Sequence, residues 1–378
     1  MASKATFIWA IILIFGVCEV VENASSCCVN ANCNARIAYF ISELNERGTT
    51  VATFDYAVFN TEFIPRLGCP LILYGTEKAK NDLVEKIFVD EFGSDSVLCV
   101  TWERIDDSLL QRHNITHLYY LNPNKYITTD HIPTSVRLLL HYSFDFENSG
   151  SVRCDVCAKV SPVVRGDIPI VPHIVRQDIS ILHGPNMRNS LGIPPNATVF
   201  CRHGGYGQFD AQFVKEVIKV IATSTRRDIY FVFVNTEPFT SDDPREFVGH
   251  DRVFYLDTIV NLDEKSRFIR TCDALLHARS RGETFGLAVA EFSAHNRPVI
   301  TYDRGRSMSE RHHINTLGSR GMVFKNSGEL SRLLLQFNRT KAALEEWNAY
   351  AEYSPERVTK IFENIFLNDD PASHECQS

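Results

Sequence analysis

Two glutamates with seven residues between them, Glu283 and Glu291, have the type and spacing that suit ligand binding. Apolar runs at residues 273–277 and 298–302 predict two strands, and the stretch between them predicts a turn and then a helix that begins near Thr284. The free amide groups at such a helix N-terminus bind phosphates in α/β proteins. A carboxylate accepts hydrogen bonds from two hydroxyl groups, and eight residues of helix span roughly 12 Å. We therefore expect the two glutamates to hold hydroxyl groups at two ends of a ligand that carries phosphate.

A second turn of the same kind lies earlier in the chain. The apolar run 197–202 predicts a strand that ends in Arg202, and Gly204 and Gly205 follow it. Asp210 comes next and is suited to cap the N-terminus of the following helix. Glycines in a strand-to-helix turn let a ligand approach the backbone closely.

The elements that must position these turns alternate along the chain. In the first half, residues 36–44 predict a short helix, and residues 50–54 and 136–140 predict strands that end at Asp55 and His141. The second half repeats the alternation of strands and helices more regularly. This order implies parallel sheets, so the expected fold class is α/β, with two Rossmann-like doubly wound domains.

Length and composition agree with two domains of ordinary size. The chain has 378 residues, of which 44% are hydrophobic, and a formal net charge of −7, which gives no reason to expect nucleic acid as a partner. A proline-rich segment, residues 162–195, is typical of a connection between domains. The expected division is a signal segment at 1–26, a first domain at 27–185, a second domain at 186–337 and a helical tail at 338–378.

The N-terminus has the pattern of a signal peptide. Lys4 precedes an apolar run, residues 5–18, which has the length of a signal core and is short for a membrane span. We expect cleavage after Cys18 or after Ser26; the alternative is a retained signal-anchor, with a membrane as partner only in that case. The expected location is the lumen of the secretory pathway, in the endoplasmic reticulum or Golgi, or outside the cell. There, four sequons would be available for glycosylation, at Asn23, Asn114, Asn196 and Asn338.

The cysteine content fits an oxidising compartment. Eleven cysteines are present, and loss of Cys18 with the signal would leave an even number for disulfides. Cys154 and Cys157 have the spacing of a redox motif, but no helix opens after a strand there, so we favour a structural disulfide. Several other pairings stay open, since Cys27, Cys28 and Cys33 can pair with one another or with Cys69 or Cys99.

Adjacent histidines at His312 and His313 raise the question of a metal site. Adjacent side chains of a helix diverge, and no cysteine or carboxylate stands at ligand spacing, so we interpret them as a surface pair. No metal and no other cofactor is expected.

Two α/β domains, a proline-rich connection and a final helical segment resemble the GT-B architecture of glycosyltransferases. In that architecture the two domains face a cleft and the C-terminal tail crosses back to the first domain. Residues 272–291 are similar to the Glu-x7-Glu motif region of family-4-like retaining glycosyltransferases. A small, largely uncharacterised group of bacterial and giant-virus members is more similar still, through residues 54–57, 141–145, 204–206 and 234–236.

The resemblance implies a role for each matching residue. Glu291 accepts hydrogen bonds from the ribose of the donor nucleotide, and Glu283 holds hydroxyl groups of the transferred sugar. Arg202 neutralises the diphosphate, and His141 faces the cleft and touches the donor sugar near its reacting carbon. Asp55, at a strand exit, helps to bind donor or acceptor. The other expected donor-binding residues are Gly204, Gly205, Arg279, Gly282, Thr284, Phe285, Gly286 and Leu287.

One position departs from the family pattern. The family usually has a lysine a few residues after the arginine that corresponds to Arg202, but Gln208 and Asp210 occupy this region here. Arg279, Arg281 or Arg304 would have to supply the second positive charge, or the affinity for the donor is low.

The expected function is that of a metal-independent retaining glycosyltransferase. It would move a sugar from a nucleotide-diphospho-sugar to a glycan or another hydroxyl acceptor. One alternative is an inverting transferase or a phosphorylase on the same fold. The other is a secreted, catalytically degenerate protein that binds a glycan or nucleotide without turnover, and the missing lysine favours this alternative.

Overall fold

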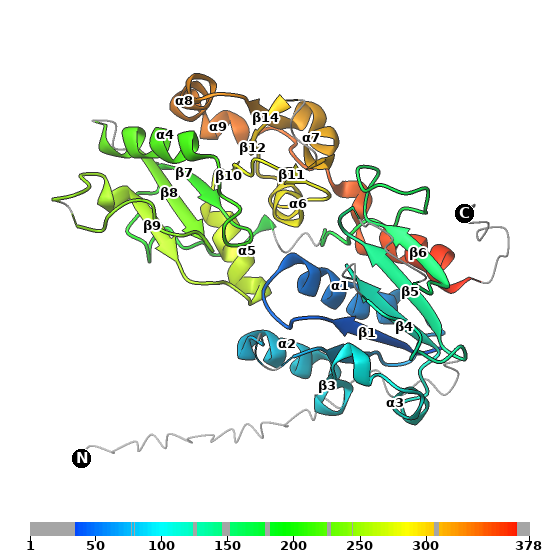
Figure 1. Cartoon of the computed structure of the whole chain (residues 1–378). Helices are drawn as coiled ribbons and strands as arrows, with labels where there is room; N and C mark the ends of the chain where they lie inside the picture. Colours follow the sequence, from blue (N-terminus) through cyan, green and yellow to red (C-terminus); the bar gives the residue numbers. More distant parts are fainter. Residues whose placement is uncertain are drawn as a thin grey trace, which may run out of the picture.

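The chain folds into two α/β domains, each built on a six-stranded parallel sheet (Figure 1). The computed structural model describes residues 35–76, 78, 80–123, 127–145, 152–177, 182–224, 228–243, 245–305 and 310–368. The predicted signal segment, the sequon at Asn23 and the cysteines Cys27, Cys28 and Cys33 lie outside these residues. Within the described part of the chain, no helix has the length and apolar character needed to cross a bilayer.

The first sheet is fully parallel and its central strands are buried on both faces. Its strands are β1 (Ile37–Ile41), β2 (Leu71–Tyr74), β3 (Val97–Cys99), β4 (His117–Leu121), β5 (Arg137–Tyr142) and β6 (Val156–Lys159). They pair in the order β3-β2-β1-β4-β5-β6. The helices of this part of the chain are α1 (Gly48–Phe63), α2 (Asp82–Phe92) and α3 (Asp107–Arg112).

The second sheet repeats the same plan. Its strands are β7 (Thr198–Arg202), β8 (Ile229–Val234), β9 (Val253–Leu256), β10 (Ala274–His277), β12 (Val299–Tyr302) and β14 (Gly321–Phe324), in the order β14-β12-β10-β7-β8-β9. A two-stranded pair, β11 (Gly282–Glu283) with β13 (Glu310–Arg311), lies beside it. The helices are α4 (Gln212–Thr223), α5 (Leu262–Thr271), α6 (Leu287–Ala294), α7 (His312–Leu317), α8 (Ser327–Gln336) and α9 (Arg339–Ala342).

At the start of the first domain the predicted elements were wrong. Residues 36–44, predicted as a helix, contain strand β1, and residues 50–54, predicted as a strand, belong to helix α1. All five residues of β1 are buried, so the strand shows no alternation of polar and apolar side chains. Much of α1 is also buried, including two threonines, and its packing overrides their preference for strands. Asp55 therefore lies inside a helix and not at a strand exit.

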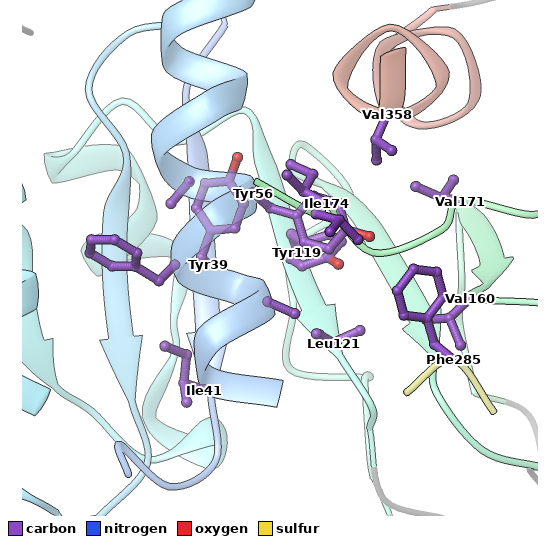
Figure 2. Packing of buried hydrophobic residues seen from close by; sticks show 14 of the residues in the cluster. Tyr39, Ile41, Tyr56, Tyr119, Leu121, Val160, Val171, Ile174, Phe285 and Val358 are labelled. Carbon is purple, nitrogen blue, oxygen red and sulfur yellow. The ribbon is translucent and has the colours of Figure 1, made fainter. Parts of the chain in front are cut away.

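The C-terminal tail crosses back to the first domain, as predicted. It consists of α10 (Pro355–Phe362) and a final helical turn at Glu363–Leu367, and in Figure 1 this red segment lies beside β5 and β6. The ring of Phe362 lies 5.4 Å from the ring of Tyr56 in α1 and 5.4 Å from that of Tyr119 in β4. Figure 2 shows Tyr56 and Tyr119 with Val358 of the tail helix in the same cluster. The tail thus completes the core of a domain that begins more than 300 residues earlier in the chain.

Two disulfide bonds are present among the residues that the structure describes. Cys154 pairs with Cys157, which confirms the predicted bond. Cys201, the penultimate residue of β7, pairs with Cys272, which follows α5, and this bond was not predicted. The sequons at Asn114, Asn196 and Asn338 are all exposed.

Replacing Phe362 with alanine should weaken the docking of the tail. The side chain is fully buried, so Phe362→Ala is expected to lower the free energy of unfolding by about 3–5 kcal/mol through lost contacts and a cavity. Urea unfolding followed by tryptophan fluorescence measures this change. Leu344→Ala is the matched control, because Leu344 is 85% exposed and should change stability by less than about 0.5 kcal/mol. Equal midpoints for the two variants would contradict the docking described here.

Candidate functional site

A cleft of about 580 Å³ is lined by residues of both domains. It lies where the parallel strands of the second sheet end, beside the glycine turns predicted from the sequence. The first domain contributes residues 45–51, 54–55, 84, 87–88, 122, 143–144 and 173. The second domain contributes residues 202–206, 208–209, 235, 259–260, 262, 265, 277–279, 283–288 and 291.

Glu283 lies in this cleft with two cationic or polar partners. Its Oε2 atom accepts a hydrogen bond of 2.6 Å from Arg279 Nη1, and its Oε1 atom lies 3.2 Å from His277 Nε2. Burial alone would raise the pKa of this carboxyl, but the hydrogen bond from His277 and the charge of Arg279 outweigh it and lower the pKa. Glu283 is therefore an ionised carboxylate with a fixed orientation.

Glu291, in helix α6, is paired in the same way. Lys265 Nζ in α5 donates to its Oε1 atom at 2.6 Å, and His203 Nδ1 lies 3.8 Å from its Oε2 atom. Burial raises the pKa of this carboxyl, and the neighbouring charge of Lys265 more than reverses that effect, so the pKa is lowered. The two glutamates thus form two separate, compensated negative charges in one cleft.

Helix α6 begins at Leu287, three residues later than predicted. Glu283 therefore lies in strand β11, so the distance to Glu291 is not that of eight helical residues. Gly286 caps the helix with a φ of 87°, a conformation that favours glycine, and a Cβ atom there would lie 3.2 Å from the Cβ of Glu283. The first amide groups of α6 have no side-chain cap and border the cleft.

Arg202 borders the cleft, but its guanidinium group donates hydrogen bonds to backbone carbonyl oxygens. Nη1 donates to the carbonyl oxygen of Val234 at 3.0 Å, and Nη2 donates to the carbonyl oxygen of Gly205 at 2.5 Å. Burial lowers the pKa of Arg202 to about 10. Its observed role is to hold the Gly204–Gly205 turn against the end of β8.

The predicted N-cap at Asp210 is wrong. Helix α4 begins at Gln212 with Ala211 as its N-cap, and Asp210 Oδ1 instead accepts a hydrogen bond of 2.7 Å from the backbone amide of Ser280. This bond ties the two ligand-facing turns of the second domain to each other.

The side chain of His141 does not face the cleft. It is fully buried in the first domain, where its Nδ1 atom lies 2.7 Å from the hydroxyl of Tyr119 and its ring lies 5.6 Å from that of Phe366 in the tail. Alternation along β5 turns this side chain toward the tail, which covers that face of the sheet. His173 lines the cleft instead, with its ring 5.1 Å from that of Phe285.

Asp55 lines the cleft from the first domain. Its Oδ1 atom accepts hydrogen bonds from Arg176 Nη2 at 2.7 Å and Nε at 3.0 Å. Burial raises the pKa of Asp55, and the charge of Arg176 opposes this only in part. The carboxyl is thus held in place by one guanidinium group.

The predicted surface pair, His312 and His313, is buried instead. The two side chains diverge as expected: His312 stacks 5.7 Å from Phe285, and His313 lies 4.9 Å from His277, behind Glu283. Among the described residues, no cluster of three histidine, cysteine or acidic side chains could hold a metal ion.

Most of the predicted site residues come together in the cleft, namely Asp55, Arg202, Gly204, Gly205, Arg279, Glu283, Thr284, Phe285, Gly286, Leu287 and Glu291. Gly282 lies just outside the lining, with a φ of 86° that positions Glu283. Of the alternative cations, Arg281 pairs with Glu310, and neither Arg281 nor Arg304 lines the cleft.

Four residues that line the cleft were not predicted from the sequence as site residues: Lys265, His203, His277 and His173. Two of them had a local signal: His277 ends a predicted strand and His203 follows one directly, so both had to lie at the carboxyl edge of the sheet. Lys265 had none, because only the packing of α5 against α6 brings it to Glu291.

The fold is shared with solved structures of glycosyltransferases. A glycosyltransferase from Rickettsia africae has a TM-score of 0.60 at 13% identity, over 88% of this chain and 99% of that one. HepE of Anabaena, in a complex with UDP-glucose, has a TM-score of 0.56 at 12% identity, over 88% and 95%. TarM has a TM-score of 0.57 at 10% identity, over 89% and 99%. No protein-family model and no curated protein sequence matches the chain. At these identities the likeness shows the fold, so the predicted GT-B architecture is confirmed.

The buried histidines around the cleft should make stability depend strongly on pH. Burial lowers the pKa of His173 and of His313 to about 3 and that of His312 to about 4, from 6.5. As pH falls below about 6.5 the unfolded chain takes up protons before the folded chain does, so the free energy of unfolding declines toward pH 4. At pH 5 each histidine should cost about 2 kcal/mol. Urea unfolding at constant ionic strength measures the slope, and His173→Phe should make it shallower; an unchanged slope would contradict the buried neutral histidine.

Removing the amine of Lys265 should leave Glu291 as an uncompensated, partly buried charge. Lys265→Met is expected to lower the free energy of unfolding at pH 7 by about 2–4 kcal/mol, and adding Glu291→Gln should restore part of the loss. Lys219→Met is the control, because Lys219 and Glu216 form an exposed pair that should contribute less than about 0.5 kcal/mol. If the losses in free energy of unfolding from Lys265→Met and Glu291→Gln simply add in the double variant, Lys265 and Glu291 are not coupled.

Proposed function

We propose that this protein is a retaining, metal-independent glycosyltransferase that uses a nucleotide-diphospho-sugar. The observation that carries the proposal is the pair of ionised carboxylates, Glu283 and Glu291, on either side of the N-terminus of α6 in a cleft between two domains. The structural likeness to HepE, which was crystallised with UDP-glucose, supports the class of donor.

The donor would lie along the second domain. Glu291 would accept hydrogen bonds from the ribose, and Glu283 would accept them from the hydroxyl groups of the sugar. The diphosphate would then lie between the Gly204–Gly205 turn and the first amide groups of α6, where the backbone comes closest to the cleft. Fixed amide dipoles at this point would stabilise the charge that develops on the leaving diphosphate.

Lys265 is a cation of the cleft that can meet the diphosphate. Its amine is buried beside the cleft and has three donors, of which one is used by Glu291. The guanidinium group of Arg202, in contrast, already donates to backbone carbonyl oxygens. The family pattern has a lysine near the position of Gln208, and this chain has none there. Lys265 would supply that missing positive charge.

The acceptor would enter from the first domain. Gly48, at the start of α1, faces Leu287 at the start of α6, and an added Cβ atom would lie 3.5 Å from Leu287 Cδ1. Asp55, held by Arg176, lies on the same wall and can accept a hydrogen bond from an acceptor hydroxyl. In the route that we propose, the acceptor hydroxyl attacks the face of the sugar that the diphosphate leaves, so a dedicated base is not required.

A degenerate binding protein is the second candidate. The bonds from Arg202 to the backbone favour it, because they leave the diphosphate with fewer cations than the family pattern provides. Such a protein would bind the nucleotide-sugar in the same cleft without transferring the sugar.

Two glutamine substitutions should separate the roles of the glutamates. Glu291→Gln should weaken nucleotide binding about tenfold or more, because a charge-assisted bond to the ribose is lost. Glu283→Gln should leave nucleotide affinity within about threefold and reduce sugar transfer about a hundredfold. Thermal shift and calorimetry with UDP-, GDP-, ADP- and CDP-sugars measure the first effect. Glu264→Gln is the control, since Glu264 is an exposed residue of α5. Unchanged binding of every nucleotide by Glu291→Gln would contradict the assignment.

The anomeric configuration of the product, measured by NMR, tests the reaction class. The proposal predicts a product with the configuration of the donor sugar, whereas an inverted product would indicate an inverting transferase. Binding of a nucleotide-sugar without hydrolysis or transfer would favour the degenerate binding protein.

A further inference from the structure

A second polar groove, of about 990 Å³, lies on the opposite side of the second domain from the cleft. Thr198, Asp273 and Pro298 line it at the points where β7, β10 and β12 begin, whereas the cleft lies at the ends of the same strands. Four to five residues of strand separate the two sites, which is roughly 13–16 Å. The groove is therefore independent of the donor site.

The charge of this groove is positive, although the whole chain carries a net charge of −7. Two carboxylates line it, Asp273 and the exposed Asp228, and Asp273 is shared between two arginines. Its oxygens lie 2.8 Å from Arg188 Nη2 and 3.4 Å from Arg339 Nε. Four arginines line the groove, Arg188, Arg270, Arg297 and Arg339.

The arginines differ in how many hydrogen-bond acceptors their guanidinium groups have. Arg188 is buried and donates to the carbonyl oxygens of Thr271 and Ala197 as well as to Asp273, so it forms part of the wall. Among the described residues, the guanidinium group of Arg297 has one long hydrogen bond, from Nη2 to the carbonyl oxygen of Arg270 at 3.5 Å, and its buried Nε atom has no partner. A largely desolvated guanidinium group with so few acceptors is costly, and an anion in the groove would supply acceptors for the donors of Arg297 that face it.

The surroundings of Arg297 strengthen this reading. Burial lowers the pKa of Arg297, the charges of Arg188, Arg339 and Arg270 lower it further, and the charge of Asp273 opposes them. Like charges gathered around one carboxylate repel one another to an extent that water reduces, and a further negative group in the groove would lower this repulsion.

The groove also joins segments that are far apart in the sequence. Arg188 belongs to the connection between the domains, and Arg270 Nε donates to the carbonyl oxygen of Pro185 in the same connection at 3.0 Å. Arg339 comes from the beginning of the tail and donates to the carbonyl oxygen of Pro195 at 2.6 Å. An anion in the groove would contact the second domain, the connection and the tail together.

We propose that this groove binds an oxyanion of the phosphate class, a phosphate or a sulfate group, with Arg297 and Arg339 as its principal ligands. Both groups are tetrahedral and present several oxygens to guanidinium donors, so they share the chemistry that the groove offers. The site is separate from the proposed donor site, and it does not depend on the proposed transferase activity.

Isothermal titration of the full chain with inorganic phosphate, and in a second arm with sulfate, tests the proposal. Sodium chloride at matched ionic strength serves as the reference for screening. The wild type should bind one or both oxyanions, and Arg297→Met should weaken that binding about tenfold or more because a charge-assisted donor pair is lost. Arg339→Met should weaken it as well, and it keeps the test valid if Arg297→Met fails to fold.

Two control variants locate the binding. Arg320→Met removes an exposed arginine of the same domain and should bind the anion as the wild type does. Lys265→Met removes one cation of the cleft and, once circular dichroism shows that it is folded, should also retain binding at the groove. Loss of binding in the folded Lys265→Met variant would place the anion in the cleft and overturn the proposal. Wild-type affinity in both Arg297→Met and Arg339→Met, or a response to chloride equal to that to phosphate and sulfate, would overturn it too. Binding of phosphate alone, or of sulfate alone, would identify which oxyanion the groove accepts.

Discussion

Two partly buried carboxylates in one cleft set the main constraint on this structure. A buried charge is costly unless it is paired, so each glutamate requires a partner that the fold must deliver to it. Glu283 has Arg279 and His277, and Glu291 has Lys265 and His203. The partners keep both carboxylates ionised and fixed in orientation before any ligand arrives, which is what a site that binds hydroxyl groups needs.

The fold satisfies this constraint through the ends of its parallel strands. His277 ends β10 and His203 follows β7, while Gly286 lets the chain turn sharply into α6. Phe285, next to Gly286, is buried against the first domain and the tail: its ring lies 5.1 Å from His173, and its carbonyl oxygen accepts a bond of 3.1 Å from the hydroxyl of Tyr350. The loop that carries Glu283 is therefore anchored at the junction of the two domains, so a change in their angle would move this carboxylate.

Local patterns in the sequence predicted the second domain well and the site in part. The strands predicted there at residues 197–202, 273–277 and 298–302 each begin one residue later than predicted and end where predicted, because short apolar runs bounded by glycine and polar residues are unambiguous there. The elements of the first domain were harder to predict from the sequence. Strand β1 and helix α1 are both buried, so β1 lacks the alternation typical of a strand and α1 lacks the periodicity typical of a helix. His141 was misplaced for a related reason: the tail that covers it lies more than 200 residues away in the sequence. Lys265 could not have been found from local pattern, because its partner Glu291 belongs to another helix.

A crystal structure of the full chain with a nucleoside diphosphate or nucleotide-sugar would show which groups hold the donor. We expect ribose hydroxyls within hydrogen-bond distance of Glu291 and a phosphate at the first amide groups of α6. We also expect the amine of Lys265 to turn from Glu291 toward the diphosphate. A nucleotide bound outside this cleft, or one bound in it with the Lys265–Glu291 pair intact and no phosphate at α6, would contradict the proposed donor site.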